Sequence, residues 1–400
     1  GEMNRPAPGF GLMNTASTSR RTFFRTAAAS TAWLGGGPLF KGLPLISAEE
    51  SRIDPSMVRF NSGIEPMVKL LEDTPRERLL EEVAVRVRNG TTAREVMTAL
   101  LLAGVRNIQP RPVGFKFHAV LVVHSAHLAS LNSPDTDRWL PVFWALDQFK
   151  ASQARDVQEG NWTMAPVDEK SVPSADRAKA EFRSAMEAWD EAKADAAVAG
   201  LSRTCGAQEV FDLFCRYGAR DFRDIGHKII YTANSWRMLQ HCGWQHAEPV
   251  LRSLTYALLE HEGDNPAARE APADMAGRRN AELLKKLNPA WSGGALSADG
   301  TKEMLRALRQ GTDQDASEKA VELLNRGVSP SSLWDAVFQH CSELLMRKPG
   351  IVTLHASTTA NALHYAFGQT SSDETRRFLL LQAAAFATSF RDRGEAQLVR

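Results

Sequence analysis

Helix signals follow one another along the chain, and no segment shows the alternating apolar and polar residues of a half-buried β-strand. Residues 74–77 (TPRE) are typical of a capping box with proline at the first helical position, and residues 89–90 (NG) predict the end of that helix. Thr92 with Glu95 predicts a second capping box. Residues 174–198 are highly charged and predict a further helix. The fold class that we predict is therefore all-α.

The composition is that of a globular protein with enough apolar material for a large core. Of the 400 residues, 43% are hydrophobic and 24% are charged, which excludes a disordered or collagen-like chain. No apolar run approaches the roughly 18 residues that a membrane span needs, so we expect no span in the mature chain. The net charge of +1 gives no reason to expect nucleic acid as a partner.

Two parts of the chain resemble each other at a constant offset of 237 positions, without a gap. Residues 90–127 read GTTAREVMTALLLAGVRNIQPRPVGFKFHAVLVVHSAH, and residues 327–364 read GVSPSSLWDAVFQHCSELLMRKPGIVTLHASTTANALH. The aligned pairs include Gly90 and Gly327, Thr92 and Ser329, His118 and His355, and His127 and His364. The similarity predicts an internal repeat of helical units that pack against one another.

A third, looser copy lies between these two and contains His227 directly after Gly226. Each unit is predicted to consist of a helix, a loop, a histidine at a helix start and further helices. We therefore expect residues 49–400 to form one large all-α domain. The predicted copies span about 76–155, 205–262 and 303–395, and two polar stretches, about 155–173 and 263–300, are predicted to connect helical groups.

The first 48 residues carry the pattern of an export signal. Residues 19–25 read SRRTFFR, and a mild apolar run of small residues follows. A paired arginine before such a run is typical of the twin-arginine pathway. Cleavage near residues 46–48 (ISA) would remove five basic residues and one acidic residue, which leaves a mildly acidic chain. We therefore predict recognition by the twin-arginine export machinery and a periplasmic or otherwise exported location. Because this pathway carries folded proteins, export also favours a cofactor inserted beforehand.

The cysteines do not form a metal-binding motif. None of the four is part of a CxxC pair, so a zinc knuckle is not expected. Cys205 and Cys215 could form a disulfide in an oxidising compartment or remain buried thiols, and the sequence leaves both possibilities open.

Three histidines occupy the same place in the three predicted copies: His118, His227 and His355. Equivalent positions in packed repeats tend to approach a common axis, as facing helices of a bundle do. Three neutral imidazoles that meet there would suit Zn, Fe or Cu and leave positions free for oxygen or substrate. The alternative is that each histidine forms a hydrogen bond to a carbonyl within its own unit. We favour a transition-metal site for the three together, with iron as the predicted metal.

Five other residues complete the predicted site. Lys228 is our candidate catalytic amine if it is buried, since burial lowers a lysine pKa, whereas an exposed lysine would simply extend into solvent. A regular helix that begins at His118 would turn His124 away from the ion, so His124 is not a predicted ligand. The predicted substrate contacts are Asn234, Trp244 and His124. The fourth metal ligand that we predict is His246.

Other catalytic signatures are absent from the sequence. It contains no GxSxG, no Walker loop, no HExxH, no CxxCH haem attachment, and no nicotinamide or flavin fingerprint. The acidic residues are scattered, so no glycosidase pair can be chosen.

The three histidine segments resemble the questin oxidase family, whose members show an early "NH" helix, a central "GHxLIRTAH…LAYW" and a late "VHAVTxPxAL". The corresponding segments here read FKFHAVLVVHSAH, GHKIIYTANSWRML…LTYALL and TLHASTTANALHYAF. The family arginine is replaced by Tyr231, and its second central histidine by Asn234. The resemblance implies an all-α fold and oxidative cleavage of aromatic polyketides with molecular oxygen, by histidine-bound iron or without a cofactor.

The function that we predict is an exported oxidoreductase, a histidine-ligated non-haem iron oxygenase that acts on a small organic substrate, with aromatic compounds among the candidates. Two alternatives stay open. The chain could be a non-catalytic helical binding or scaffold protein with structural histidines, or it could hold haem non-covalently through one of them.

Overall fold

The computed structural model describes residues 58, 60, 61 and 63–396, with side chains up to residue 391. The predicted export signal and its cleavage site lie outside these residues. Within the described part of the chain there are 17 α-helices and no strand, and an isolated bridge joins Ala295 to Val328. The prediction of an all-α fold is confirmed.

The first group of helices packs around α4. Its members are α2 (Glu65–Asp73), α3 (Arg76–Arg88), α4 (Ala93–Asn107), the 3-10 helix η1 (Phe115–Phe117), α5 (His118–Leu121), α6 (Val123–Asn132) and α7 (Trp139–Glu159). The capping box of Thr92 and Glu95 at the start of α4 is confirmed. The one predicted at residues 74–77 is wrong. The Thr74 hydroxyl instead donates to the Leu70 carbonyl (2.5 Å) and closes α2, so that Pro75 precedes α3 without a side-chain cap.

The second group includes α11, on which α10 and α12 pack, while α9 packs on α8 and α12. This group consists of α8 (Ala175–Ala188), α9 (Glu191–Thr204), α10 (Ala207–Gly218), η2 (Asp224–Gly226), α11 (His227–Cys242), η3 (Trp244–His246) and α12 (Ala247–Leu258). The single helix predicted over 174–198 is two helices. Trp189 adopts a left-handed conformation (φ 55°, ψ 37°) with its ring buried, and Asp190 caps α9 by accepting from the Lys193 amide at 3.1 Å. The chain therefore turns at Trp189, where the charge pattern predicts one continuous helix.

The third group contains α13 (Pro272–Leu283), η4 (Leu284–Lys286), α14 (Ala298–Gln310), α15 (Asp313–Asn325), α16 (Pro330–Arg347), α17 (Ile351–Gln369) and α18 (Asp373–Ala396). The predicted connection over 263–300 thus includes a helix, α13, that packs on α15 and α18. The buried Asn280 side chain donates to the Gln382 side-chain oxygen (2.7 Å) and anchors it there. The stretch 155–173 is helical up to Glu159 and irregular afterwards.

The repeat signals agree at the helix starts but differ at the histidines. Gly90 and Gly327 both have positive φ (105° and 84°), and the two residues that follow them by two positions, Thr92 and Ser329, both cap a helix. In contrast, His118 is the first residue of α5, whereas His355 lies in the second turn of α17 rather than at a helix start. The repeat as a whole stays a prediction.

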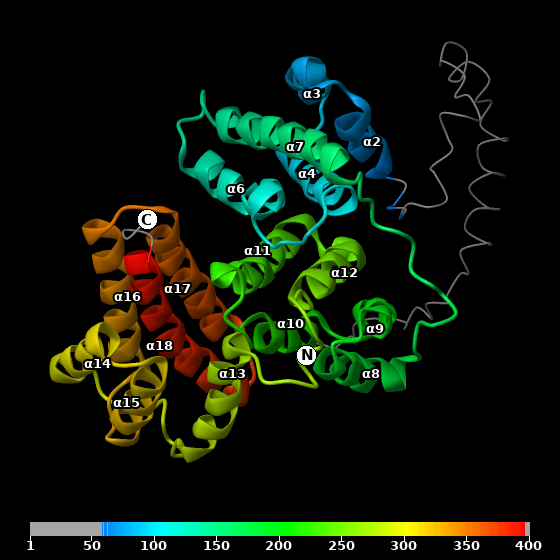
Figure 1. Ribbon diagram of the computed structural model, residues 1–400. Coiled ribbons are helices and arrows are strands. Elements are labelled where there is room, and N and C mark those ends of the chain that lie inside the picture. Colours follow the sequence, from blue (N-terminus) through cyan, green and yellow to red (C-terminus); the bar gives the residue numbers. More distant parts are fainter. Residues whose placement is uncertain (1–57, 59, 62, 397–400) are drawn as a thin grey trace, which may run out of the picture. The chain divides into compact units, whose positions relative to one another are not determined.

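Helix α11 packs against both α4 and α17 (Figure 1). Its buried side chains belong to two hydrophobic cores. On one side, residues such as Tyr231 and Met238 join the core of the first helices, and on another Ala233 and Trp236 join the core of the last ones. Because successive residues of a helix are rotated by about 100°, α11 also has a third edge, which belongs to neither of these two sides. That edge carries His227, and α5 and α17 pack beside it.

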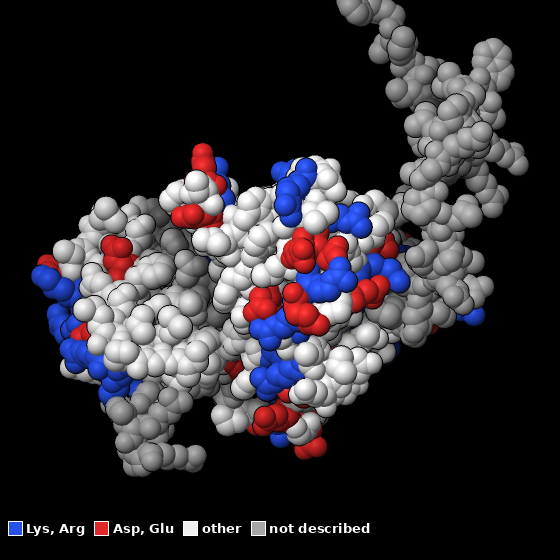
Figure 2. Space-filling model, turned by 90° about the horizontal axis from the view of Figure 1, so that it is seen from above, with Lys and Arg blue, Asp and Glu red and all other residues white. Residues whose placement is uncertain are grey.

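Charged groups on the surface are mixed in sign. Figure 2 shows Lys and Arg intermingled with Asp and Glu over one face, consistent with exposed pairs such as Arg76 with Asp147 (2.7 Å). Exposed pairs of this kind contribute little to stability. Among the described helices, none has the length and apolar character required to cross a bilayer.

Candidate metal centre

The three predicted histidines come together. The Nε2 atom of His227 lies 3.1 Å from Nε2 of His118 and 2.9 Å from Nε2 of His355. The three ligand atoms all lie within 4.8 Å of one another, and the rings meet at steep angles rather than stacked. Side chains from three separate helices therefore converge on one point, as predicted.

The second nitrogen of each ring fixes the tautomer. Nδ1 of His118 lies 2.9 Å from the Phe115 carbonyl, Nδ1 of His227 lies 2.6 Å from the Asp224 carbonyl, and Nδ1 of His355 lies 2.6 Å from the Ile351 carbonyl. A carbonyl oxygen only accepts, so each Nδ1 must carry the hydrogen. In a neutral ring Nε2 then holds a bare lone pair, and all three lone pairs are directed to the shared point. This is the orientation in which histidines ligate metals.

Burial keeps two of these rings uncharged. His227 is 5% exposed and His355 is 6% exposed. Burial, with smaller contributions from the neighbouring imidazoles, lowers the pKa of His227 to about 3, and burial also lowers the pKa of His355. The proton that would otherwise bridge these nitrogens is therefore disfavoured at neutral pH.

The two separations that involve His227 fit one metal ion. Two nitrogens bound to one ion at about 2.0–2.1 Å lie about 2.8 to 3.4 Å apart for angles between a right angle and the tetrahedral value. The 2.9 and 3.1 Å separations fall in this interval. Three protein ligands leave coordination positions for water or substrate, as in catalytic rather than structural sites. The histidine group can therefore hold a transition metal.

Strained turns position two of the ligands. His118 follows η1 and His227 follows η2, and each ring is bonded to the carbonyl three positions earlier. Those carbonyls belong to Phe115 (φ 48°) and Asp224 (φ 54°), which both have the left-handed backbone that costs free energy in non-glycine residues. Strain of this kind gathers at functional sites because the surrounding fold must maintain it.

A glycine makes room for the central ring. Gly114 has φ +113°, and a Cβ there would come within 2.7 Å of Cε1 of His227. Only a residue without a side chain lets the backbone lie against this imidazole. The central ligand is therefore held by its carbonyl on one side and by bare backbone on another.

Hydrogen bonds also tie the three ligand helices together. Asn234 on α11 donates to the Leu121 carbonyl (3.0 Å) at the end of α5. Thr359, one turn after His355, donates to the Ile225 carbonyl (3.1 Å) in η2. The relative positions of the three ligands thus depend on contacts that leave the imidazoles themselves free to bind.

A cavity of about 460 Å³ adjoins the histidines. This size suits a small organic molecule. Besides the three histidines it is lined by Leu121, Val122, Ser125, Ile230, Asn234, Arg237, Ile351, Leu354, Ser357, Thr358, Asn361 and Ala362. Of the predicted substrate contacts, Asn234 therefore lines the cavity, while Trp244 and His124 do not belong to this lining.

The predicted fourth ligand lies outside the histidine group. His246 ends η3 and is buried beside α12, and it is not part of the group whose ligand atoms converge. Trp244 packs its ring edge-on against Trp236, with ring centroids 5.9 Å apart. The predicted substrate contact Trp244 and the predicted ligand His246 thus lie at a junction between helices, outside the lining of the cavity.

His124 belongs to a separate group of imidazoles. Its ring lies near His127, with centroids 6.3 Å apart, and His127 in turn contacts His241 at 3.9 Å. Burial lowers the pKa of His124 to about 4, which keeps this ring neutral as well. The helical phase that turned His124 away from His118 is thus consistent with the structure, although a break between α5 and α6 intervenes.

Lys228 is buried, but its amine is fully engaged elsewhere. It is 1% exposed, and Nζ donates to Asp221 (3.0 Å) and to the carbonyls of Leu258 (3.2 Å) and Glu260 (2.8 Å). Burial lowers its pKa while Asp221 opposes that change. Lys228 does not line the cavity, so the geometry assigns it to a buried ion pair rather than to catalysis.

The sequence reasoning missed Arg237. It lies ten residues after His227, and positions 227, 230, 234 and 237 share one edge of a helix. This spacing is present in the sequence and could have identified it. Asn361, its partner from α17, could be found only through the predicted repeat, which aligns it with His124.

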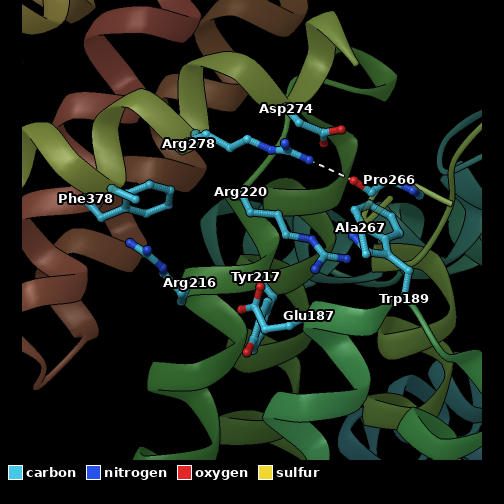
Figure 3. A pocket seen from close by; sticks show the side chains of 12 residues that line it. Glu187, Trp189, Arg216, Tyr217, Arg220, Pro266, Ala267, Asp274, Arg278 and Phe378 are labelled. Carbon is cyan, nitrogen blue, oxygen red and sulfur yellow. Dashed lines mark hydrogen bonds between the residues drawn. The ribbon is translucent and has the colours of Figure 1, made fainter. Parts of the chain in front are cut away.

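A second cavity, of about 330 Å³, is lined by a mixture of charged, aromatic and small side chains (Figure 3). Its guanidinium groups are bound by backbone and rings: Arg278 donates to the Pro266 carbonyl (2.8 Å), and Arg220 lies over the Trp189 ring at 3.7 Å. The side chain of Asp274 contributes negative charge to the same wall. This cavity brings together no set of ligating or nucleophilic side chains like that of the histidine group.

All four cysteines are free thiols, with Cys215, Cys242 and Cys341 buried and Cys205 partly exposed. The disulfide between Cys205 and Cys215 that the sequence left open is not formed in this structure.

Comparison with protein-family models, with curated proteins and with solved structures found no significant match to this chain.

Proposed function

We propose that this chain is an oxidoreductase, a non-haem iron oxygenase in which His118, His227 and His355 hold the metal and an organic substrate occupies the adjoining cavity. One observation carries the proposal: the Nε2 atom of His227 lies 3.1 Å from that of His118 and 2.9 Å from that of His355, and the ligand atoms of all three rings lie within 4.8 Å of one another. Buried lone pairs that face one another at the two shorter distances repel unless a cation lies between them.

Imidazole ligands suit zinc, copper, nickel and iron alike, so the choice of iron rests on the resemblance to the questin oxidases. Iron held by three imidazoles supplies the activation of molecular oxygen for oxidation of a bound organic molecule. Burial keeps His227 and His355 neutral, three backbone carbonyls fix the orientation of the three rings, and a largely apolar cavity adjoins them. These are the contributions expected of a preorganised site.

The two positions that depart from the family motif, Tyr231 and Asn234, are not metal ligands in this proposal, and we expect their replacement to change which substrate binds. Tyr231, which replaces the family arginine, is buried and donates to the Ser253 hydroxyl (2.8 Å), away from the cavity. Asn234, which replaces a histidine, lines the cavity. We therefore propose a substrate different from those of the family. Export through the twin-arginine pathway, which rests on residues 19–25, is part of the same proposal.

Elemental analysis of the purified protein tests the metal. We expect close to one equivalent of a transition metal in the wild type and a large loss in His227→Gln. His261→Gln, a change of a histidine outside the group, provides the control. Substoichiometric metal in the wild type, unchanged in His227→Gln, would favour the alternative of a helical binding protein with structural histidines.

An absorption spectrum of the same sample tests the haem alternative. Haem on one histidine would place its ring where a second Nε2 lies 2.9 or 3.1 Å away, so we expect no Soret band. Oxygen consumption in the presence of candidate substrates then tests the oxygenase itself, with His227→Gln as the inactive reference.

A further inference from the structure

We propose that the cavity beside the three histidines binds an organic acid, with its carboxylate on Arg237 and its apolar body directed towards the histidines. The inference deepens the proposed function, and it rests on that function only for the reaction, since binding of the acid can be measured separately.

The partners of Arg237 are neutral. Nη1 donates to the Asn234 side-chain oxygen and Nη2 to the Asn361 side-chain oxygen, both at 3.1 Å, and Cζ lies 3.9 Å from the centre of the Tyr365 ring. A guanidinium has five N–H donors, and these two amides accept from two of them. Among the described residues, no ion pair to a carboxylate is recorded for Arg237, in contrast to buried arginines such as Arg106, which pairs with Glu72 (2.7 Å).

The cavity as a whole lacks negative charge. None of the residues that line it is an aspartate or a glutamate. Arg237 is only partly exposed there, and burial lowers its pKa, which means that the surroundings disfavour its charge. A cation bound by neutral histidines would add further positive charge to the same space. A bound anion offsets both, and an arginine fork suits a planar carboxylate especially well.

The position of Arg237 indicates the shape of the ligand. His227 and Arg237 are ten residues apart on one helix, which corresponds to a rise of about 15 Å. Ile230 lies between them on the same edge, and Leu354 of α17 contributes a further apolar wall. The ligand that fits has a carboxylate at one end and an apolar body of one or two rings, rather than a small inorganic anion.

The mouth of the cavity is open to such a molecule. Ile351 is 58% exposed and Leu354 is 44% exposed, although both are large apolar residues that are usually covered. Both residues lie on the first turn of α17, and His355 follows on the second turn of the same helix. An apolar ligand that entered here would cover them.

Calorimetric titration with 2-naphthoate and its neutral isostere 2-naphthamide tests the inference on the full chain, with and without added zinc. We expect the wild type to prefer the carboxylate by about ten- to a hundred-fold, the value of a charge-assisted hydrogen-bond pair. Arg237→Gln should remove this preference, because it weakens binding of the carboxylate much more than binding of the amide. Arg86→Gln, at an exposed position on α3, serves as the matched control and should behave as the wild type.

A second variant protects the test against a folding defect. Asn361→Asp places a carboxylate beside Arg237 at an exposed position, so it should fold and should also abolish the preference, because the guanidinium then has an internal partner. Equal binding of the two naphthalene compounds by the wild type overturns the inference, as does a preference that survives in both variants. Inorganic phosphate that binds as tightly as 2-naphthoate also overturns it, since the site would then select charge alone.

The result is separable from that of the proposed function. Metal in the histidine site without carboxylate preference would refute the inference and leave the metal site intact. Carboxylate preference in a chain that binds no metal would refute the oxygenase and leave the inference intact.

Discussion

Nε2 of His227 and Nε2 of His355 lie 2.9 Å apart although 128 positions separate the two residues in the chain. Both rings give their Nδ1 hydrogen to a backbone carbonyl, so neither Nε2 can donate to the other in the neutral state. Two buried acceptors at this distance are costly unless a shared cation satisfies them. The contact therefore marks a place where the fold maintains ligands rather than a hydrogen bond.

Metal binding should stabilise the folded chain through this contact. A ligand that binds only the folded state at a hundred times its Kd adds about 2.7 kcal/mol to the free energy of unfolding. We expect the Tm of the wild type to rise when Fe²⁺ under anaerobic conditions, or Zn²⁺, is added, and to fall with a chelator. Differential scanning calorimetry measures both changes.

The matched variants for this prediction are His355→Ala and His364→Ala, two changes of the same kind on α17. His364 packs against Trp334, with ring centroids 4.9 Å apart, and is not part of the ligand group. His355→Ala should lose the response of Tm to metal, whereas His364→Ala should keep it despite a lower starting Tm. A metal response that persists in His355→Ala would contradict the assignment.

Gly114→Ala should weaken metal binding without removing a ligand. The new Cβ would come within 2.7 Å of the His227 ring, and the ring cannot move without losing its bond to the Asp224 carbonyl. We expect at least a ten-fold rise in the Kd for zinc, as found for losses of ligand orientation. Competition with a chromophoric chelator measures this constant.

Gly90→Ala is the control for backbone strain. Gly90 has φ +105°, close to the +113° of Gly114, but a Cβ there meets nothing within 4 Å. Both variants should lose similar stability from the positive φ, and only Gly114→Ala should lose affinity. Equal zinc affinities in the two variants would show that the ring tolerates the contact.

The three histidines and Asn234 could be predicted from the sequence, whereas the surroundings of the other candidates could not. His118, His227 and His355 stand out because similar segments recur along the chain, and recurrence is visible without coordinates. His246 and Trp244 lie in one short segment of the sequence, and their surroundings depend on how η3 packs against α12. Whether Lys228 is free or paired depends on Asp221 and on the carbonyls near residue 260, which only the folded chain brings to it.

The fold shows the same division between local and tertiary information. The caps at Thr92 and Ser329 are local hydrogen bonds, so their sequence signals are reliable. The break at Trp189 contradicts a strongly helical composition because burial of the ring against Arg220 outweighs helix propensity there. The helix α13 lies in a stretch rich in glycine and proline, and it forms because α15 and α18 cover it.

The free energy of unfolding should fall as the pH is lowered from about 6.5, and His340 should cause part of this change. It is 2% exposed, and burial lowers its pKa to about 4 from the ordinary 6.5. Between these values the unfolded chain binds the proton and the folded chain does not, so acid favours unfolding. At pH 5 the effect of this one residue is about 2 kcal/mol.

Urea denaturation at pH 7 and pH 5 measures this effect. In His340→Leu the difference in free energy of unfolding between the two pH values should be smaller than in the wild type by about 2 kcal/mol. The comparison does not depend on the stability of the variant at pH 7, since only the difference enters. An unchanged difference would mean that His340 stays neutral in both states or is protonated in both.

Lys228→Met should unfold the chain more readily and leave metal binding intact. Asp221 is 0% exposed in its side chain and would lose the ammonium 3.0 Å away, although Arg223 remains 3.4 Å from the same carboxylate. Removal of one partner from a buried pair costs about 3 kcal/mol or more, because the other charge stays buried.

The double variant Lys228→Met with Asp221→Asn should recover part of that loss, which distinguishes an ion pair from simple packing. Urea unfolding and zinc titration of the three proteins decide the matter. If Lys228→Met keeps the stability of the wild type within about 1 kcal/mol, the amine is not held by Asp221, and its place beside His227 would again suggest a chemical role.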